Sequence, residues 1–257
     1  MALVEYFVRD RIGYITLNRP EKRNALNPEM VTELRKGFQK AEQDDSVKII
    51  VLQANGDAFC AGADLEYLHQ LQKFSFDDNL ADSKHLKELF LQIYRLKKVV
   101  IAQVQGAALA GGCGLATVCD FVFAVPEAKF GYTEVTIGFV PAIVMVFLLR
   151  KIGEARSKEL LLTGNHISAG EAKNIGIVNK VVERTTLEKE VREFAGRLVT
   201  STSSQSLALT KTMISEVQDM KLEEALEFAA GQNAQARGTD DCKKGIEAFL
   251  TRQELKW

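Results

Sequence analysis

Hydrophobic residues follow two different periods along the first half of the chain. Residues 3–9 and 13–18 have the alternation and composition of strands. Apolar residues within 28–43 instead recur every three or four positions, which is the period of a helix with one buried face. Residues 47–53 (VKIIVLQ) form a continuous apolar segment, typical of a strand buried on both faces of a sheet. This order predicts a domain that begins with two strands, followed by a helix and then a third strand that is buried in the sheet.

The alternation of strands and helices continues through the middle of the chain. After a loop that ends near Asp64, helices are expected from this residue and over residues 83–97. Apolar segments at 99–104 and 121–125 indicate two further strands, with a short helix over 115–119 between them. Parallel strands need such crossover helices, so the pattern predicts an α/β fold with a parallel sheet.

Helical segments dominate the last part of the chain. A capping box of Ser168 and Glu171 starts one short helix, and a last strand is expected over 177–182. The final helices are too few to bury a core of their own, so they are expected to cover the main domain or a neighbouring subunit. We therefore divide the chain into a core of residues 1–195 and a helical region of residues 196–257. The longer helices are expected at 143–152, 156–163, 187–199, 203–218, 222–237 and 240–253.

Composition and charge exclude several classes of protein. The 257 residues are 46% hydrophobic and 26% charged, with a net charge of -1, which offers no attraction to nucleic acid or to an anionic membrane. No apolar stretch reaches the roughly 18–20 residues of a membrane span, and the amino terminus lacks the basic and apolar segments of a signal peptide. The cysteines (Cys60, Cys113, Cys119 and Cys242) and the scattered histidines have no metal-binding spacing. This favours reduced thiols, a cytoplasmic location and no metal site.

A strand that runs into a glycine-rich turn is the most informative feature of the chain. Residues 99–104 lead into Gly106, and Gly111, Gly112 and Gly114 then surround the start of the next helix. Unpaired N–H groups and the positive end of the helix dipole at such a place stabilise a bound anion or an oxyanion formed during a reaction. The same glycines would also permit tight packing without any chemical function. This stretch alone does not decide between the two interpretations.

A second turn of the same kind occurs at 59–65 (FCAGADL), where small residues again precede a helix. If both turns follow neighbouring strands, they direct two N–H donors at one point, as the enolate oxygen of a thioester requires. Each turn is weak evidence when taken singly. Together, in an alternating α/β pattern, they favour an oxyanion hole.

Several segments along the chain match, in order and spacing, the motifs of a known family. They are 17–27 (LNRPEKRNALN), 58–64 (AFCAGAD), 105–120, 128–134 (AKFGYTE), 162–164 (LTG) and 172–178. Over essentially its whole length the sequence resembles the crotonase (enoyl-CoA hydratase/isomerase) superfamily. The resemblance implies an α/β fold, a crotonase-type spiral of ββα repeats that holds the active site, and a carboxy-terminal helical region for trimerisation. It also implies an acyl-CoA thioester as substrate, no separate cofactor, and assembly as homotrimers or dimers of trimers.

The resemblance assigns parts of the site to residues of this chain. The backbone N–H groups of Ala63 and Gly111 would form the oxyanion hole. Lys22 and Arg23 would place positive charge near the CoA phosphates, and the alternative for them is a solvated charged turn. The alternative for Asp64 is that it only caps its helix. The residues expected along the bound acyl-CoA are Lys22, Arg23, Ala25, Ala61 and Asp64.

The number of glutamates available for acid–base chemistry separates two reactions. Many hydratases of the family use two glutamates, whereas this chain keeps the second as Glu134 and has Gly114 at the first position. A single glutamate supports isomerisation, if it moves one proton between two carbons of an enoyl-CoA. It also supports hydration, if it both activates water and delivers the proton.

The segment after Glu134 points to one of these reactions. Residues 137–144 (IGFVPAIV) replace the Pro-Gly-x-Gly-Gly that is more common in straight-chain hydratases. With the turn around Gly114, they are similar to a bacterial subgroup usually assigned to methylglutaconyl-CoA hydratases of leucine breakdown. We therefore predict a lyase, namely a hydratase for a short, branched enoyl-CoA. The alternatives are an enoyl-CoA isomerase that uses the same glutamate and a non-catalytic binding protein of the same fold.

Overall fold

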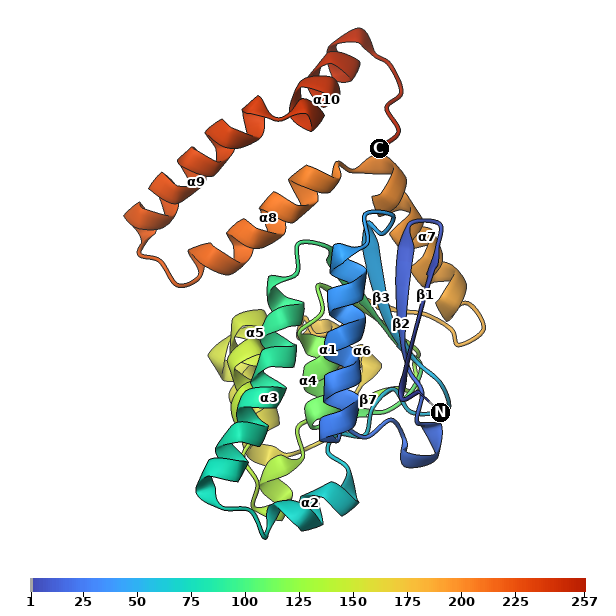
Figure 1. Ribbon diagram of the computed structural model, residues 1–257, viewed down its shortest axis with the longest axis vertical. Coiled ribbons are helices and arrows are strands. Elements are labelled where there is room, and N and C mark those ends of the chain that lie inside the picture. The colour runs from blue at the N-terminus through green and yellow to red at the C-terminus, as the bar shows by residue number, and fades with distance from the viewer. Residues whose placement is uncertain (1) are drawn as a thin grey trace.

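A six-stranded sheet forms the framework of the molecule (Figure 1). The computed structural model describes residues 2–257. The strands are β1 (Val4–Arg9), β2 (Ile12–Leu17), β3 (Ile49–Ala54), β4 (Val99–Val104), β6 (Phe121–Ala124) and β9 (Lys180–Val181). They lie in the order β1-β2-β3-β4-β6-β9. All neighbours after the antiparallel β1–β2 pair are parallel, which confirms the predicted α/β alternation.

A second, smaller sheet lies beyond the end of β4. It contains β5 (Ala108–Leu109), β7 (Lys129–Gly131) and β8 (Ile167–Ser168). β5 and β7 are parallel, with Leu109 opposite Gly131, and β8 pairs with β7 in the antiparallel sense. Sequence periodicity did not predict these strands, because two or three residues are too few to show an alternation.

Two long helices, α1 (Pro28–Gln43) and α3 (Phe76–Arg95), pack side by side (Figure 1). α1 has the predicted bounds. The predicted start of α3 at residue 83 is wrong, because Ser75 and Asp78 form a capping box that begins the helix earlier. This box is visible in the sequence, but the run of polar residues that follows it hides the helical period.

A glycine interrupts the longest helical element, α5 (Ala142–Thr163). Gly153 has a φ of +76°, in the left-handed region that favours glycine, and it divides α5 into the two helical segments expected from the sequence. The other elements before the carboxy-terminal helices are η1 (Pro20–Lys22), α2 (Leu65–Leu71), α4 (Gly111–Thr117), η2 (Glu134–Ile137) and α6 (Ala169–Asn174).

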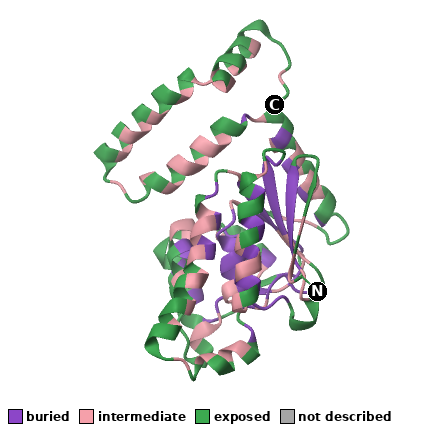
Figure 2. Ribbon diagram, in the orientation of Figure 1, coloured by how far each residue is buried: buried purple, intermediate pink, exposed green. Residues whose placement is uncertain are grey.

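The hydrophobic core extends from the main sheet to the inner faces of the helices (Figure 2). Every residue of β2 is buried, and β3 and β4 are buried over most of their length. The fully buried aromatic rings of Phe38, Phe59 and Phe90 contribute large apolar areas to this core. The parallel strands therefore have hydrophobic residues on both faces, as the sequence indicated.

Helix α7 (Leu187–Ser201) packs on the main sheet and is held there by a buried lysine. Lys48 immediately precedes β3 and is 5% exposed. Its Nζ donates hydrogen bonds to the carbonyl oxygens of Val199 (2.8 Å) and Thr202, at the end of α7. Burial lowers the pKa of Lys48 to about 8. These two carbonyl groups compensate in part for the loss of water around the amine.

Three further helices project from the core (Figure 1): α8 (Ser204–Val217), α9 (Leu222–Gly238) and α10 (Asp240–Thr251). Lys211 on α8 joins them to the sheet, because its Nζ donates to Asp120 Oδ2 (2.6 Å) and to the carbonyl oxygen of Lys98 (3.0 Å). The projecting part begins after α7, so the predicted boundary at residue 195 falls inside a helix that belongs to the core. The division of roles between residues 1–195 and 196–257 stays a prediction.

Much of the projecting helices is exposed to solvent (Figure 2), and the exposed residues include large apolar ones. Monomeric proteins seldom expose a large group of apolar side chains on their helices, and such a group usually marks a surface that contacts another molecule. Across residues 2–257, none of the helices combines the length and the apolar character needed to cross a membrane. The most exposed of these side chains are Leu222, Leu226, Phe249 and Leu250.

Candidate functional site

The two small-residue turns predicted from the sequence lie against each other. A Cβ atom added to Gly112 would lie 2.1 Å from the carbonyl oxygen of Cys60. One added to Gly62, whose φ is +93°, would lie 2.8 Å from the Ala110 Cβ atom. Glycine is therefore required at both positions, because any side chain would separate the turns. Tight packing is part of the role of these glycines, and it brings the two turns together.

Backbone pairing of the first turn leaves the N–H of Ala63 free. Leu26 donates to the carbonyl oxygen of Gly62 (2.7 Å), and the N–H of Asp64 donates to the carbonyl oxygen of Leu26 (2.8 Å). Because the residues on either side face Leu26, the N–H of Ala63 points the opposite way, as in a strand pair. Within residues 2–257 it has no hydrogen-bond acceptor.

The second turn presents the N–H of Gly111 close to the same place. Ala110 has a φ of +48°, which is strained for a residue with a side chain, and its N–H donates to the carbonyl oxygen of Gly131 (2.7 Å). Gly111 follows as the first residue of α4, so its N–H has no partner inside the helix. It lies 3.6 Å from the point where a Cβ of Gly62 would stand. Both free donors are therefore near the contact between the turns.

Glu134 lies alongside the first turn of α4 because β5 and β7 are parallel. The chain leaves Leu109 to form α4 and leaves Gly131 to reach Glu134, so these two segments run in the same direction. The Oε2 atom of Glu134 is buried and has no hydrogen-bond partner among the described residues 2–257. Burial raises the pKa of Glu134 above its ordinary value of 4.5. A carboxyl group in this state is suited to accept and return a proton.

A buried polar contact behind Glu134 joins β7 to α4. The hydroxyl of Tyr132 donates to Thr117 Oγ1 (2.9 Å), and both residues are buried. Burial raises the pKa of the Cys113 thiol to about 11, and the charge of Glu134 adds to this rise, so the carboxyl group is near α4. No motif marks Thr117 as part of the site, because only the fold brings it to Tyr132.

The structure brings the residues expected along the CoA into one region. Arg23 has a φ of +50°, and its carbonyl oxygen accepts a hydrogen bond from the N–H of Ala61 (3.0 Å). Ala25 is buried two residues further on. Lys22 is on the surface, where its Nζ contacts Glu66 Oε1 (2.5 Å). A contact between these residues and CoA stays a prediction.

Asp64 is occupied as a helix cap. Its Oδ1 accepts hydrogen bonds from the N–H groups of Glu66 (2.8 Å) and Tyr67 (3.2 Å), and its Oδ2 accepts one from Arg19 (2.5 Å). Burial by itself raises the pKa of Asp64, but Arg19 and the backbone donors outweigh burial and hold it below its ordinary value. Arg19 could not be recognised from the sequence, because nothing in its local sequence indicates a partner 45 positions away. A contact of Asp64 with CoA stays a prediction.

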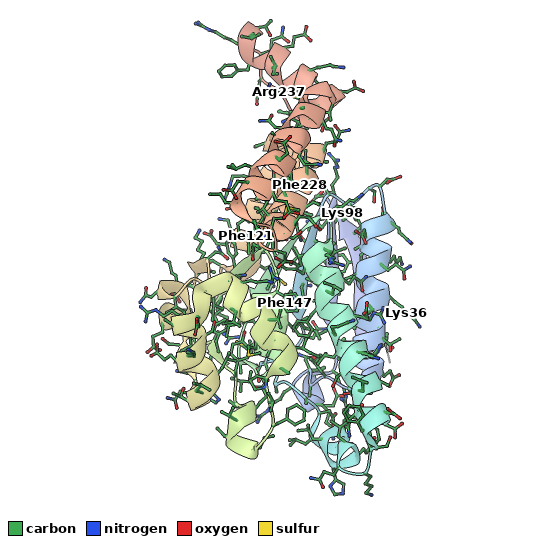
Figure 3. All side chains as sticks on the ribbon, turned by 90° about the vertical axis from the view of Figure 1, so that its left-hand side faces the viewer. Lys36, Lys98, Phe121, Phe147, Phe228 and Arg237 are labelled. Atoms are coloured by element: carbon green, nitrogen blue, oxygen red, sulfur yellow. The ribbon has the colours of Figure 1, made fainter. Side chains whose placement is uncertain are left out.

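Two cavities lie away from these groups. One of about 360 Å³ adjoins the carboxy-terminal end of α4 and is lined in part by Lys151 and by Phe121 and Phe147, which Figure 3 labels. The other, of about 620 Å³, is a groove between α1 and α3. Neither is lined by Gly111 or Glu134. In the part of the chain that the structure describes, no three histidine, cysteine or acidic side chains gather to hold a metal.

Comparison with known sequences identifies the family. The profile of the enoyl-CoA hydratase/isomerase family matches residues 8–257. A protein of Thermus thermophilus that is provisionally assigned as an enoyl-CoA hydratase is 40% identical over 95% of this chain and 96% of its own length. A crotonyl-CoA hydratase of Syntrophomonas wolfei is 34% identical over 96% of this chain and 95% of its own length.

Solved structures agree with this result. The enoyl-CoA hydratase of Mycobacterium smegmatis superimposes with a TM-score of 0.93, at 30% identity, over 99% of this chain and 98% of that one. The chain therefore belongs to the enoyl-CoA hydratase/isomerase family, the crotonase superfamily. The predicted crotonase fold is confirmed, including the helices at the carboxy terminus.

The contact between the two turns is tested by Gly112→Ala. Its Cβ atom would lie 2.1 Å from the carbonyl oxygen of Cys60. The free energy of unfolding, measured with urea, is expected to fall by about 1–3 kcal/mol, as for other overpacked sites. Gly196→Ala in α7 is the control, because no atom lies within 4 Å of the added group. It is expected to raise stability by about 0.5–1 kcal/mol. An unchanged unfolding midpoint for Gly112→Ala would show that the turns do not need this contact.

The raised pKa of Glu134 has a consequence for stability. The folded protein holds this proton more tightly than the unfolded chain, so ionisation of Glu134 destabilises the fold at neutral pH. Glu134→Gln is therefore expected to increase the free energy of unfolding at neutral pH. The penalty is absent below the ordinary pKa of 4.5 and complete above the raised value, so the gain is expected to disappear in acid. Urea titrations over this pH range check it, and a gain that persists in acid would contradict titration as the cause.

Proposed function

We propose that the protein is an enoyl-CoA hydratase, which adds water across the double bond next to the thioester of an enoyl-CoA. The observation that carries the proposal is the arrangement of two free backbone N–H groups beside the carboxyl group of Glu134, whose Oε2 is buried without a partner among residues 2–257. The family relationship supports it, since relatives include a crotonyl-CoA hydratase and a short-chain-enoyl-CoA hydratase.

The N–H groups of Ala63 and Gly111 act as the oxyanion hole. Addition of hydroxide at the β-carbon of the enoyl group places negative charge on the thioester oxygen. Two donors fixed by backbone packing stabilise that charge without reorganising during the reaction. This role suits backbone groups at a contact where glycines keep side chains away.

Glu134 supplies the acid–base chemistry alone. As a carboxylate it takes a proton from water, and the resulting hydroxide forms a bond to the β-carbon while the double-bond electrons move to the thioester oxygen. The protonated Glu134 then gives its proton to the α-carbon as the enolate collapses. Water is added in total, and the carboxylate is regenerated. The raised pKa of Glu134 favours the first half of this cycle, because a carboxylate is a better proton acceptor when its pKa is raised.

The CoA moiety lies along the loop that contains η1. Lys22 and Arg23 face the phosphates, while Ala25 and Ala61 offer small side chains beside the pantetheine and adenine end. Asp64 caps α2 and also pairs with Arg19, which immediately precedes η1, so that it holds α2 against this loop. The exposed amine of Lys22 is available to an incoming phosphate once it leaves Glu66.

The acyl group in this proposal is short and branched, with methylglutaconyl-CoA of leucine breakdown as the specific candidate. The proposal rests on the similarity of residues 137–144 and the turn around Gly114 to the subgroup assigned to that reaction. A second candidate is enoyl-CoA isomerisation. One observation favours it, namely that a single glutamate is sufficient to move a proton between two carbons.

The assembly in this proposal is a homotrimer or a dimer of trimers in the cytoplasm. Support for a partner copy comes from the apolar side chains exposed on α9 and α10. Support for a reducing compartment comes from the free cysteines Cys60, Cys113, Cys119 and Cys242.

The reaction is tested by comparing methylglutaconyl-CoA, crotonyl-CoA and a 3-enoyl-CoA in labelled water. The highest kcat/KM is expected for methylglutaconyl-CoA, with incorporation of labelled oxygen. Glu134→Gln is expected to lose about 10²–10⁴-fold in kcat while it retains thioester binding. A preference for the 3-enoyl substrate without incorporation of oxygen would establish the isomerase instead. No turnover of any thioester by the wild type would favour a binding protein.

The assembly is tested by light scattering, with a mass of three or six times 28.5 kDa expected. Phe249 on α10 is 83% exposed, and Phe249→Asp is expected to dissociate the assembly because it places a charge in the apolar contact. Leu162→Asp, at a 72% exposed position on α5, is the matched control and is expected to leave the mass unchanged. A monomeric wild type would overturn the proposed assembly.

A further inference from the structure

Helices α4 and α5 meet at a position where no side chain fits. A Cβ atom added to Gly114 would lie 2.3 Å from Val144 Cγ1, 2.9 Å from Val144 Cβ and 3.0 Å from Phe90 Cε1. Val144 is 4% exposed and Phe90 is fully buried, so neither has free space to move into. The volume next to Gly114 is therefore filled by Val144, with Phe90 behind it.

This sequence departs from the pattern of straight-chain hydratases at two places, and the structure shows that the residues at these two places contact each other. Gly114 stands where many hydratases have a glutamate, and Val144 ends the segment 137–144 that replaces Pro-Gly-x-Gly-Gly. A side chain at position 114 would collide with Val144. The branched side chain of Val144 is accommodated only because Gly114 has none.

Gly114 lies on the helix that carries one of the oxyanion donors, Gly111. Gly114 follows Gly111 by three residues, so both lie on one face of α4, about 4.5 Å apart along its axis. The segment that carries Glu134 runs beside the same helical turn. A thioester with its oxygen at Gly111 and its reacting carbons at Glu134 would lie over this face, beside the contact of Gly114 with Val144.

We propose that Val144 is a specificity-determining residue of the acyl site. This inference rests on the proposed hydratase function. Val144 gives the site a hydrocarbon wall where a second carboxyl group would otherwise stand, so that the acyl group contacts an apolar surface and water is held by Glu134 alone. The wall limits how far an acyl chain extends toward α3.

The packing behind Val144 keeps this wall in place. The rings of Phe90 on α3 and Phe147 on α5 stack with their centroids 5.9 Å apart. Figure 3 shows Phe147 between these two helices. Tyr94, one helical turn after Phe90, packs against the same Phe147 ring, with the two ring centroids 5.4 Å apart. Val144 therefore rests on an aromatic layer that does not yield easily to a longer acyl group.

The selectivity role is tested by Val144→Ala, with Val146→Ala as the matched control. Val146 is on the same helix but is 47% exposed, so it has the same chemistry without the contact to Gly114. Removal of the two Val144 methyl groups is expected to raise the ratio of kcat/KM for hexenoyl-CoA over crotonyl-CoA by about 10-fold, the lower end of the range typical of one methylene in a pocket. Val146→Ala is expected to leave this ratio unchanged.

The outcomes separate the inference from the function on which it rests. A wild type that hydrates no enoyl-CoA overturns the proposed function. A wild type that hydrates crotonyl-CoA, with the same chain-length ratio in Val144→Ala and Val146→Ala, leaves the function intact and overturns the role of Val144.

A thermodynamic cycle tests the contact itself, and it remains informative if Val144→Ala folds less well. Gly114→Ala is expected to lower the melting temperature, because its Cβ would lie 2.3 Å from Val144 Cγ1. The double variant Gly114→Ala/Val144→Ala removes this Cγ1 atom and is expected to melt above the value given by adding the two single changes. Strict additivity would show that the two residues do not constrain each other.

Discussion

The structure depends on the close approach of two backbones at Gly112 and Cys60. Strands β3 and β4 are neighbours in the main sheet, and the turns that follow them contact each other only because one side of each contact is a glycine, Gly112 against Cys60 and Gly62 against Ala110. The donors at Ala63 and Gly111 are set by this packing and not by any flexible group. A rigid backbone contact of this kind defines the position of an oxyanion more narrowly than side chains would.

Some of the groups around this contact stabilise the fold, and another is suited to take part in the reaction. The buried hydroxyl groups of Tyr132 and Thr117 form a hydrogen bond with each other, which holds the end of β7 against α4. Glu134, close to them, has a buried oxygen with no partner in residues 2–257. The first pair stabilises the fold, whereas the second group is kept reactive at some loss of stability. A site of this type needs both, since the reactive group keeps its place only if its neighbours are fixed.

Local signals in the sequence predicted much of the fold and part of the site. The bounds of α1 follow from Asn27 and Pro28, which cap and start the helix, and the parallel sheet follows from its continuous apolar segments. The short strands β5, β7 and β8 have no such signal. The turns and Glu134 were recognised as candidates from the sequence, but the partners of Gly114 and Asp64 were not. Val144 and Arg19 are remote in sequence, and their roles arise only from tertiary packing.

The buried amine of Lys48 links the main sheet to a helix that comes much later in the chain. Its two acceptors are 151 and 154 positions later, in the last turn of α7 and just beyond it. Docking of α7 takes this amine out of water, and its two carbonyl acceptors keep that burial from leaving an unsatisfied ammonium group, which would be strongly unfavourable. During synthesis on the ribosome, the main sheet therefore reaches its final stability only after the chain has emerged past Thr202. A fragment that ends before this residue leaves the lysine without its acceptors, however complete its active-site residues are.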